Sequence, residues 1–313
     1  MKRIAVLLLF LLLLLCSCSF SGKGEYEVTF ALGDETVSAS YECGTAPVMP
    51  EVADRAHYTL VGWAFDAAGL RPYAAGVPLY SDTTLYPVWS YDSSEVINDI
   101  YTGEIEMCVT VDARGYNVVF GIVTDSDSTQ GSGVVCHEEM GYYYILTNSH
   151  VTDVTEGYKY AEYVVTDCYG NTTAAELIGS DSSTDLALLR IKKGIKHLYV
   201  APVADTDPEV GDTVIALGAP DGVRNAVTFG KVLRLAPVAG EGSEQGTEVD
   251  FPVIWHDAAM AHGSSGGALL NERLELVGVN FAIATDGRDG EYLYGFTIPR
   301  SAVSAFLERC IPG

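Results

Sequence analysis

The chain has 313 residues, 48% of them hydrophobic, which is the composition of a globular protein long enough for two domains of unequal size. Its 18 basic and 42 acidic residues give a formal net charge of −24 at pH 7. A surface this negative repels phosphate backbones, so the composition argues against nucleic acid as a partner.

The first residues have the pattern of an export signal. Two basic residues precede an apolar run, Ile4 to Leu15, which has signal-peptide length and is too short for a membrane span. The motif LCSC that ends at Cys18 resembles the bacterial lipoprotein signal. This resemblance implies that residues 1–17 are removed, that Cys18 is lipidated, and that residues 18–25 form a tether. A plain secretory signal with an incidental cysteine is the alternative. Both interpretations predict an extracytoplasmic protein.

Residues 26–90 are expected to form a small module rich in β-strands. Apolar and polar residues alternate in several short segments, which predicts strands. The segments VTF at 28–30, HYTLVGW at 57–63 and TLYPVW at 84–89 resemble the internalin-type (Listeria–Bacteroides) cell-surface repeat of bacteria. The resemblance implies a β-grasp-like fold. Trp63 and Trp89 end two of these strands, where packing in the core is favoured over ligand binding.

The polar residues 91–95 are predicted to be a linker, and residues 96–313 to be a second domain. Short strands with turn signals about every 8–12 residues indicate an all-β sandwich or barrel in this domain. One helix is expected near the C-terminal end, because apolar residues from Ala302 to Leu307 recur at helical spacing. Ser301 before them is a candidate N-cap.

Three residues have the surroundings that nucleophilic hydrolysis requires. Ser265 lies in the segment GSSGG, where backbone N–H groups can approach a developing oxyanion. His150 follows an apolar strand and Asp185 begins another, so that rigid strand ends would present both side chains. An α/β-hydrolase is excluded, because its histidine follows the serine and the last histidine here is His262.

Several ordered segments, in addition to these residues, resemble the HtrA/Deg branch of trypsin-like serine proteases. They read GSGVV, ILTNSHV, TDLALLRI, VGDTVIALGAP, GSSGGALLN, LVGVN and YGFTIP along the chain. The resemblance implies a chymotrypsin-like fold of two six-stranded β-barrels with the site in the cleft between them. It makes Ser265 the nucleophile, His150 the general base and Asp185 the orienting acid, with the N–H groups of Gly263 and Ser265 as the oxyanion hole.

The same resemblance predicts a substrate pocket with Ala259 at its base and Asn280, Phe281 and Ala282 along its wall. Since no carboxylate stands at position 259, cleavage after Lys or Arg is disfavoured, and small or medium apolar residues are the expected preference. The Gly- and Glu-rich loop 238–248 is either a gate or a disordered loop.

The sequence therefore predicts a serine endopeptidase, lipid-anchored at the bacterial cell surface, that needs no cofactor or metal. It would hydrolyse proteins or peptides through an acyl-enzyme, with protein quality control as the role that the family implies. Most of this branch carries PDZ modules, and we expect none here because the chain stops shortly after Pro299. The alternative is a binding or adhesion lipoprotein with a latent protease domain. The oligomeric state and the pairing of five cysteines remain open; these are Cys43, Cys108, Cys136, Cys168 and Cys310.

Overall fold

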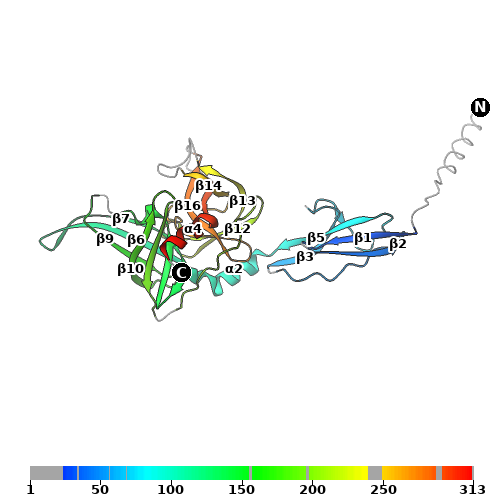
Figure 1. The fold of residues 1–313 in the computed structure, drawn as a ribbon, viewed down its shortest axis with the longest axis horizontal. Helices are drawn as coiled ribbons and strands as arrows, with labels where there is room; N and C mark the ends of the chain where they lie inside the picture. Colours follow the sequence, from blue (N-terminus) through cyan, green and yellow to red (C-terminus); the bar gives the residue numbers. More distant parts are fainter. Residues whose placement is uncertain are drawn as a thin grey trace, which may run out of the picture. The chain divides into compact units, whose positions relative to one another are not determined.

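The computed structural model describes residues 24–311, except residues 34, 56, 68, 155–156, 195–196, 239–248 and 287–290. The predicted signal peptide, the lipidation site Cys18, most of the tether and nearly all of the loop 238–248 lie outside the described residues. Within the described part, no helix is both long and apolar enough to cross a membrane. The chain divides into two compact units between Ser93 and Ser94 (Figure 1).

The first unit is a five-stranded mixed sheet in the order β2-β1-β5-β3-β4, in which β1 and β5 are parallel. Its core is rich in aromatic side chains. Tyr26, Val28 and Phe30 of β1 contribute to it together, because alternate residues of a strand point to the same face of the sheet. Trp63 lies in this core and packs edge-on against Phe30, with 5.2 Å between the ring centroids. Trp89 is only half-buried, so the prediction of core packing is confirmed for Trp63 alone. The strands are β1 (Glu25–Ala31), β2 (Thr36–Glu42), β3 (Tyr58–Ala64), β4 (Pro72–Tyr73) and β5 (Thr83–Tyr91).

Two short helices open the second unit. Helix α2 (Ser93–Thr102) begins inside the stretch expected to be a linker, and it buries Val96 and Ile100 completely. The 3-10 helix η1 (Glu104–Met107) follows and leads into the first barrel. The apolar residues of α2 are four positions apart, which places them on one face of the helix.

The first β-barrel is closed by six antiparallel strands in the order β10-β11-β8-β7-β6-β9. Its interior holds aliphatic side chains that alternate along each strand, such as Val109 and Val111 of β6 and Ile145 of β8. A short helix, α3 (Ser149–Thr152), follows β8. The strands are β6 (Cys108–Val119), β7 (Ile122–Glu139), β8 (Tyr142–Thr147), β9 (Tyr160–Thr166), β10 (Thr172–Asp181) and β11 (Leu186–Lys192).

The second barrel repeats this architecture in the order β12-β13-β14-β17-β16-β15, so the predicted pair of six-stranded barrels is confirmed. The 3-10 helix η2 (Pro220–Gly222) lies between β12 and β13. The strands are β12 (Thr213–Gly218), β13 (Ala226–Val238), β14 (Val249–His256), β15 (Ala268–Leu270), β16 (Leu276–Thr285) and β17 (Tyr292–Pro299).

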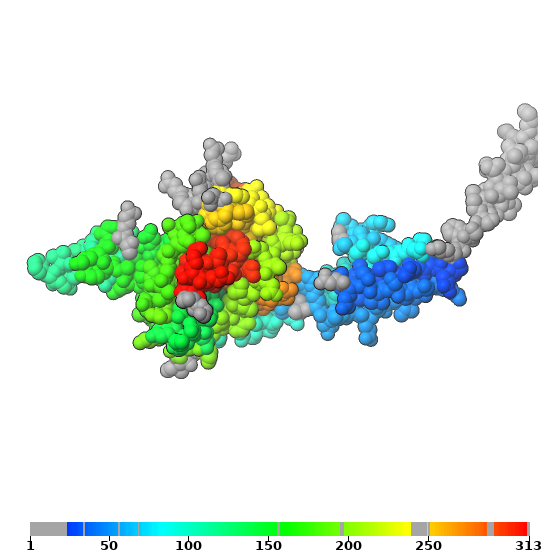
Figure 2. Space-filling model, in the orientation of Figure 1, coloured from blue at the N-terminus to red at the C-terminus, as the bar shows by residue number. Residues whose placement is uncertain are grey.

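The C-terminal helix α4 (Arg300–Cys310) contacts both barrels, through β16 and β17 of the second and β11 of the first. Figure 2 shows it lying on the surface where the two barrels meet. The guanidinium of Arg309 forms an ion pair with Asp181 of the first barrel, at 2.6 Å. The prediction of Ser301 as N-cap is wrong: Pro299 occupies that position, and Ser301 donates its backbone N–H to Asp207 in the first turn.

Candidate active site

The structure brings His150 and Asp185 together. The imidazole Nδ1 of His150 lies 2.7 Å from Asp185 Oδ2, and the backbone N–H of His150 donates to the other carboxylate oxygen at 2.9 Å. The carboxylate therefore orients both the ring and the backbone of the histidine. The His150 side chain is 51% exposed and that of Asp185 is 17% exposed, so the ring faces solvent while the acid behind it is largely covered.

The backbone conformation of Asp185 and the hydrogen bonds to its carbonyl fix the position of its carboxylate beside His150. Asp185 has a positive φ of 51°, a conformation that aspartate tolerates better than most residues. Its carbonyl accepts hydrogen bonds from Asn148 Nδ2 at 2.8 Å and from the Ser149 N–H at 3.2 Å. The start of β11 is thus fixed to helix α3 by backbone and side-chain bonds together.

Gly131 is the point where the histidine segment and the serine turn meet. A Cβ atom on Gly131 would lie 2.7 Å from a methyl group of Val151 and 2.9 Å from the carbonyl oxygen of Ser265. Val151 follows His150 directly in the chain, and the carbonyl belongs to Ser265 itself. Strand β7 therefore places the segment of His150 beside the segment of Ser265. Only a residue without a side chain permits this approach.

The hydroxyl of Ser265 donates to the carbonyl of Phe281, at 3.2 Å. Its single proton is therefore directed toward strand β16 and away from His150 in this conformation. Ser265 itself is half-buried, in the turn between β14 and β15.

Two N–H groups of the serine turn point away from protein acceptors. Within the part of the chain that the structure describes, Gly263 and Ser265 donate their N–H groups to no acceptor, whereas Ser264, Gly266 and Gly267 donate theirs to backbone carbonyls. Gly263 and Gly266 have φ values of 91° and 86°, so glycine is required for this turn. The arrangement leaves two donors on one turn available to a substrate oxygen.

Of the four residues predicted to bind substrate, Ala259 and Asn280 line one narrow cavity beside the serine turn. Among the residues that the structure describes, no charged one lines this cavity; the other lining residues are Ala216, Leu217, Gly218, Pro220, Ala226, Thr228, Met260 and Ser264. The side chains of Phe281 and Ala282 are buried, and Phe281 packs 6.3 Å from the ring of Phe296. Phe281 thus presents its backbone to the site, through the carbonyl bonded to Ser265.

A chain of three buried polar side chains, which the sequence did not predict, lies behind the turn. Thr297 donates its hydroxyl to Asn280 Oδ1 at 2.7 Å, and His256 Nε2 lies 3.0 Å from the same hydroxyl. Because the hydroxyl proton is used on Asn280, His256 must donate its Nε2–H to Thr297. Asn280 in turn exchanges backbone hydrogen bonds with Gly266 and Gly267, so this chain fixes the floor of the serine turn. No sequence pattern marks three residues so far apart.

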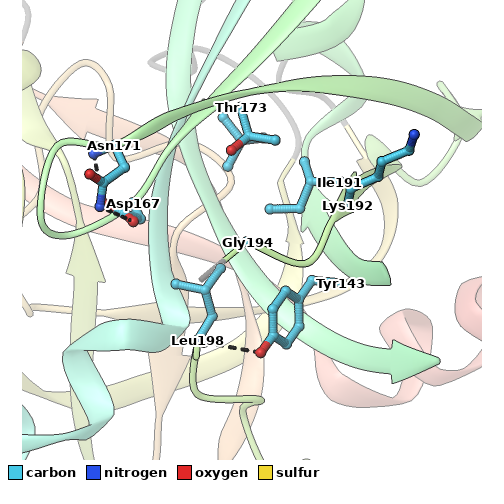
Figure 3. A pocket seen from close by; sticks show the side chains of 9 residues that line it. Tyr143, Asp167, Asn171, Thr173, Ile191, Lys192, Gly194 and Leu198 are labelled. Atoms are coloured by element: carbon cyan, nitrogen blue, oxygen red, sulfur yellow. Dashed lines mark hydrogen bonds between the residues drawn. The ribbon is translucent and has the colours of Figure 1, made fainter. Parts of the chain in front are cut away.

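A separate pocket of about 390 Å³ opens in the first barrel, and none of its lining residues belongs to the predicted site (Figure 3). Three of its polar side chains, those of Asp167, Asn171 and Tyr143, are hydrogen-bonded within the protein. The Asp167 carboxylate accepts from the backbone N–H groups of Tyr169 and Asn171 and from the Asn171 side chain. The Tyr143 hydroxyl accepts the Leu198 N–H. These bonds explain the local turn and leave the serine turn as the better candidate.

Other nucleophile and metal chemistries find less support. Burial raises the pKa of the Cys108 and Cys136 thiols to about 12, so neither is a thiolate at neutral pH. Among the described residues, no group of three or more His, Cys, Asp or Glu side chains is placed to hold a metal ion.

Comparisons with known proteins agree with this geometry. Residues 131–279 match the trypsin-like peptidase domain, and residues 26–88 match the Listeria–Bacteroides repeat domain. The chain is 37% identical over 194 residues to the serine protease Do-like HtrA of Bacillus subtilis, covering 60% of this chain and 40% of that protein. It is 36% identical over 184 residues to the periplasmic pH-dependent serine endoprotease DegQ of Escherichia coli, covering 58% and 37%.

The chain spans about two fifths of the length of these curated relatives. A solved serine endoprotease from Yersinia pestis aligns with a TM-score of 0.49 and 29% identity, over 69% of this chain and 66% of that one. The sequence matches cover the segments that contain His150, Asp185 and Ser265. The chain therefore contains a segment that matches the trypsin-like peptidase domain and is similar to HtrA/Deg serine proteases, and this segment follows a match to the Listeria–Bacteroides repeat domain.

Proposed function

We propose that the chain is a serine endopeptidase with Ser265 as nucleophile, His150 as general base and Asp185 as the acid that orients the base. The observation that carries this proposal is the doubly hydrogen-bonded His150–Asp185 pair beside a serine turn with two open N–H donors. A binding scaffold has no physical need for these groups to occur together.

In the proposed reaction, the Ser265 hydroxyl first turns from the Phe281 carbonyl toward His150, a rotation between staggered side-chain positions. His150 Nε2 takes the proton while Ser265 Oγ attacks the scissile carbonyl. Asp185 holds Nδ1 protonated and stabilises the imidazolium that forms. The N–H groups of Gly263 and Ser265 receive the oxyanion. The intermediate collapses as His150 gives its proton to the leaving amine, the C–N bond breaks, and the acyl-enzyme remains. A water that gives its proton to His150 then attacks the acyl carbon, and the proton returns to Ser265 Oγ as the acid product leaves.

A fluorophosphonate probe tests this proposal on the chain from residue 24 onward. We expect the parent to be labelled and to cleave casein, and Ser265→Ala to do neither. Ser264→Ala is the matched control, because it removes the neighbouring hydroxyl of the same turn and leaves the proposed nucleophile in place. Equal labelling of Ser265→Ala and the parent would refute the assignment of the nucleophile.

The uncharged cavity at Ala259 supports a preference for small or medium apolar residues at the cleavage site. A peptide library with varied residues before the scissile bond measures this preference directly. Dominant cleavage after Lys or Arg would contradict it.

We place the protein outside the cytoplasm, attached by a lipid on Cys18, with surface or misfolded proteins as substrates. The apolar run and the LCSC motif support export and anchoring. The similarity to HtrA/Deg proteases supports the role in quality control. Mass spectrometry of the N-terminal peptide from the natural membrane fraction tests the anchor, and an unmodified Cys18 would exclude it.

The alternative, an adhesion protein with a latent protease, gains support from the Ser265 hydroxyl directed toward Phe281. Deletion of residues 26–90 separates the two proposals. If the chain is a protease, the deletion leaves cleavage of casein intact; if the repeat carries the function, surface binding disappears and the folded parent stays unlabelled.

A further inference from the structure

Ser132 of strand β7 is a completely buried polar residue that lies against the serine turn. Its hydroxyl donates to the carbonyl of Gly263 at 2.7 Å, and its backbone N–H donates to the carbonyl of Ser265 at 2.7 Å. One residue of the first barrel thus holds the carbonyls on both sides of Ser264, in the second barrel.

The same hydroxyl reaches a second segment. It accepts the backbone N–H of Ala219 at 2.8 Å, directly before helix η2. A serine hydroxyl has one proton to donate, and here both that proton and an acceptor position are used. Ser132 therefore joins the serine turn to the residue from which η2 begins.

Helix η2 contacts the serine turn through Asp221, which holds the peptide that joins His262 to Gly263. The Asp221 N–H donates to the carbonyl of His262 at 2.6 Å. A trans peptide directs its C=O and N–H to opposite sides, so this bond turns the Gly263 N–H outward. On the other side, the Gly267 N–H holds the carbonyl of Ser264 at 3.0 Å and turns the Ser265 N–H outward in the same manner.

Between the His262–Gly263 peptide and the Ser264–Ser265 peptide lies the Gly263–Ser264 peptide, whose carbonyl accepts the Ser132 hydroxyl. If the Gly263 carbonyl lost its partner, the peptide that joins Gly263 to Ser264 would keep one anchor, the Ser264 N–H bond to the Ala261 carbonyl at 3.0 Å. It could then tilt about that bond, because Gly263 at φ 91° has no Cβ to resist the movement. Rotation there changes the angle between the two outward N–H groups. Oxyanion stabilisation depends on both donors converging on one oxygen.

We infer that Ser132 is a positioning residue, which holds the peptides of the serine turn so that the N–H groups of Gly263 and Ser265 converge on the substrate oxyanion. The inference rests on the proposed function. A purely structural role for this hydroxyl predicts a loss of stability alone. The positioning role predicts a loss confined to steps that develop negative charge on the substrate oxygen.

The test compares Ser132→Ala with Thr110→Val in the full chain from residue 24. Thr110 lies directly opposite Ser132 in the β6–β7 ladder, and its buried hydroxyl has no partner among the described residues. Thr110→Val therefore removes an equally buried hydroxyl that does not reach the turn. Three quantities are measured on folded protein: kcat and KM for a peptide amide, and Ki for a peptide boronate, whose tetrahedral adduct places an oxygen in the oxyanion position.

For Ser132→Ala we expect kcat to fall about 10- to 100-fold and the boronate Ki to rise by a similar factor, with KM within about twofold of the parent. Thr110→Val should match the parent in all three. The inference is overturned if folded Ser132→Ala keeps kcat and Ki within about twofold of the parent, or if KM alone changes.

If Ser132→Ala shows no cooperative melting transition, Ser132→Cys supplies the comparison, because it keeps the side-chain size and replaces the hydroxyl by a weaker donor. Parent-like kcat in Ser132→Cys also overturns the inference if the Ala variant is unfolded. Failure of the proposed function looks different: the parent itself would then be neither labelled by fluorophosphonate nor able to cleave the peptide.

Discussion

Acidification should destabilise the second barrel through one histidine, His256. Its side chain is completely buried, and it donates Nε2–H to Thr297 behind the serine turn. Burial lowers the pKa of His256 to about 4, because the charged ring would lose its hydration and the nearby Asp257 compensates only in part. The unfolded chain would titrate the same group near pH 6.5, so between these values the unfolded state binds the proton and the folded state does not.

The sign follows from that difference. The folded pKa is below the unfolded one, so stability from this group is complete above about pH 6.5 and decreases as the pH falls. The expected loss relative to pH 7.5 is about 1.4 kcal/mol at pH 5.5 and about 3 kcal/mol at pH 4. At pH 4 the folded state is half protonated, and well below this pH the group is protonated in both states and its contribution levels off.

Urea unfolding between pH 7.5 and 4, followed by tryptophan fluorescence, measures this loss. His256→Gln is the matched variant, because the amide can still donate to Thr297 and does not titrate. The difference in unfolding free energy between the parent and the variant should shrink by about 1.4 kcal/mol by pH 5.5. A difference that stays constant within about 0.5 kcal/mol across this range would refute the reasoning, since carboxylates that titrate in both proteins cancel.

Three further predictions follow from the site. Asp185→Asn should lower kcat about 10³- to 10⁴-fold without unfolding the protein, because an amide cannot hold Nδ1 protonated; steady-state kinetics with circular dichroism check this, and a loss under about tenfold would contradict the role. Gly131→Ala should lower stability by about 1–3 kcal/mol and slow fluorophosphonate labelling, because its Cβ would meet the Ser265 carbonyl at 2.9 Å, whereas Gly194→Ala, with open space around its Cβ, should resemble the parent in both. Ala259→Asp should raise kcat/KM at least about tenfold for peptides with Arg before the scissile bond, and an unchanged profile in the peptide library would remove Ala259 from the pocket.

Alternation in the sequence predicted strands, and the family resemblance implied the two barrels and the N-terminal module; the catalytic roles of His150, Asp185 and Ser265 stay a proposal. Strands show themselves through alternation, which depends only on neighbouring residues, as in β1 with Val28 and Phe30 facing one side. The motifs around His150, Asp185 and Ser265 are short and contiguous, so each could be recognised without knowing its distance from the others. The N-cap of helix α4, which is Pro299 and not Ser301, was predicted wrongly, because it depends on what packs beside the helix.

Only the tertiary structure decided which atoms hold the site together. The bonds from Ser132 to Gly263, Ser265 and Ala219 join residues about 90 to 130 positions apart, and no local pattern encodes such a contact. The same holds for the chain from His256 through Thr297 to Asn280, whose members come from three strands. Motifs specify which chemical groups are present, but the closure of two barrels against each other fixes their directions, and direction determines whether two N–H groups can share one oxygen.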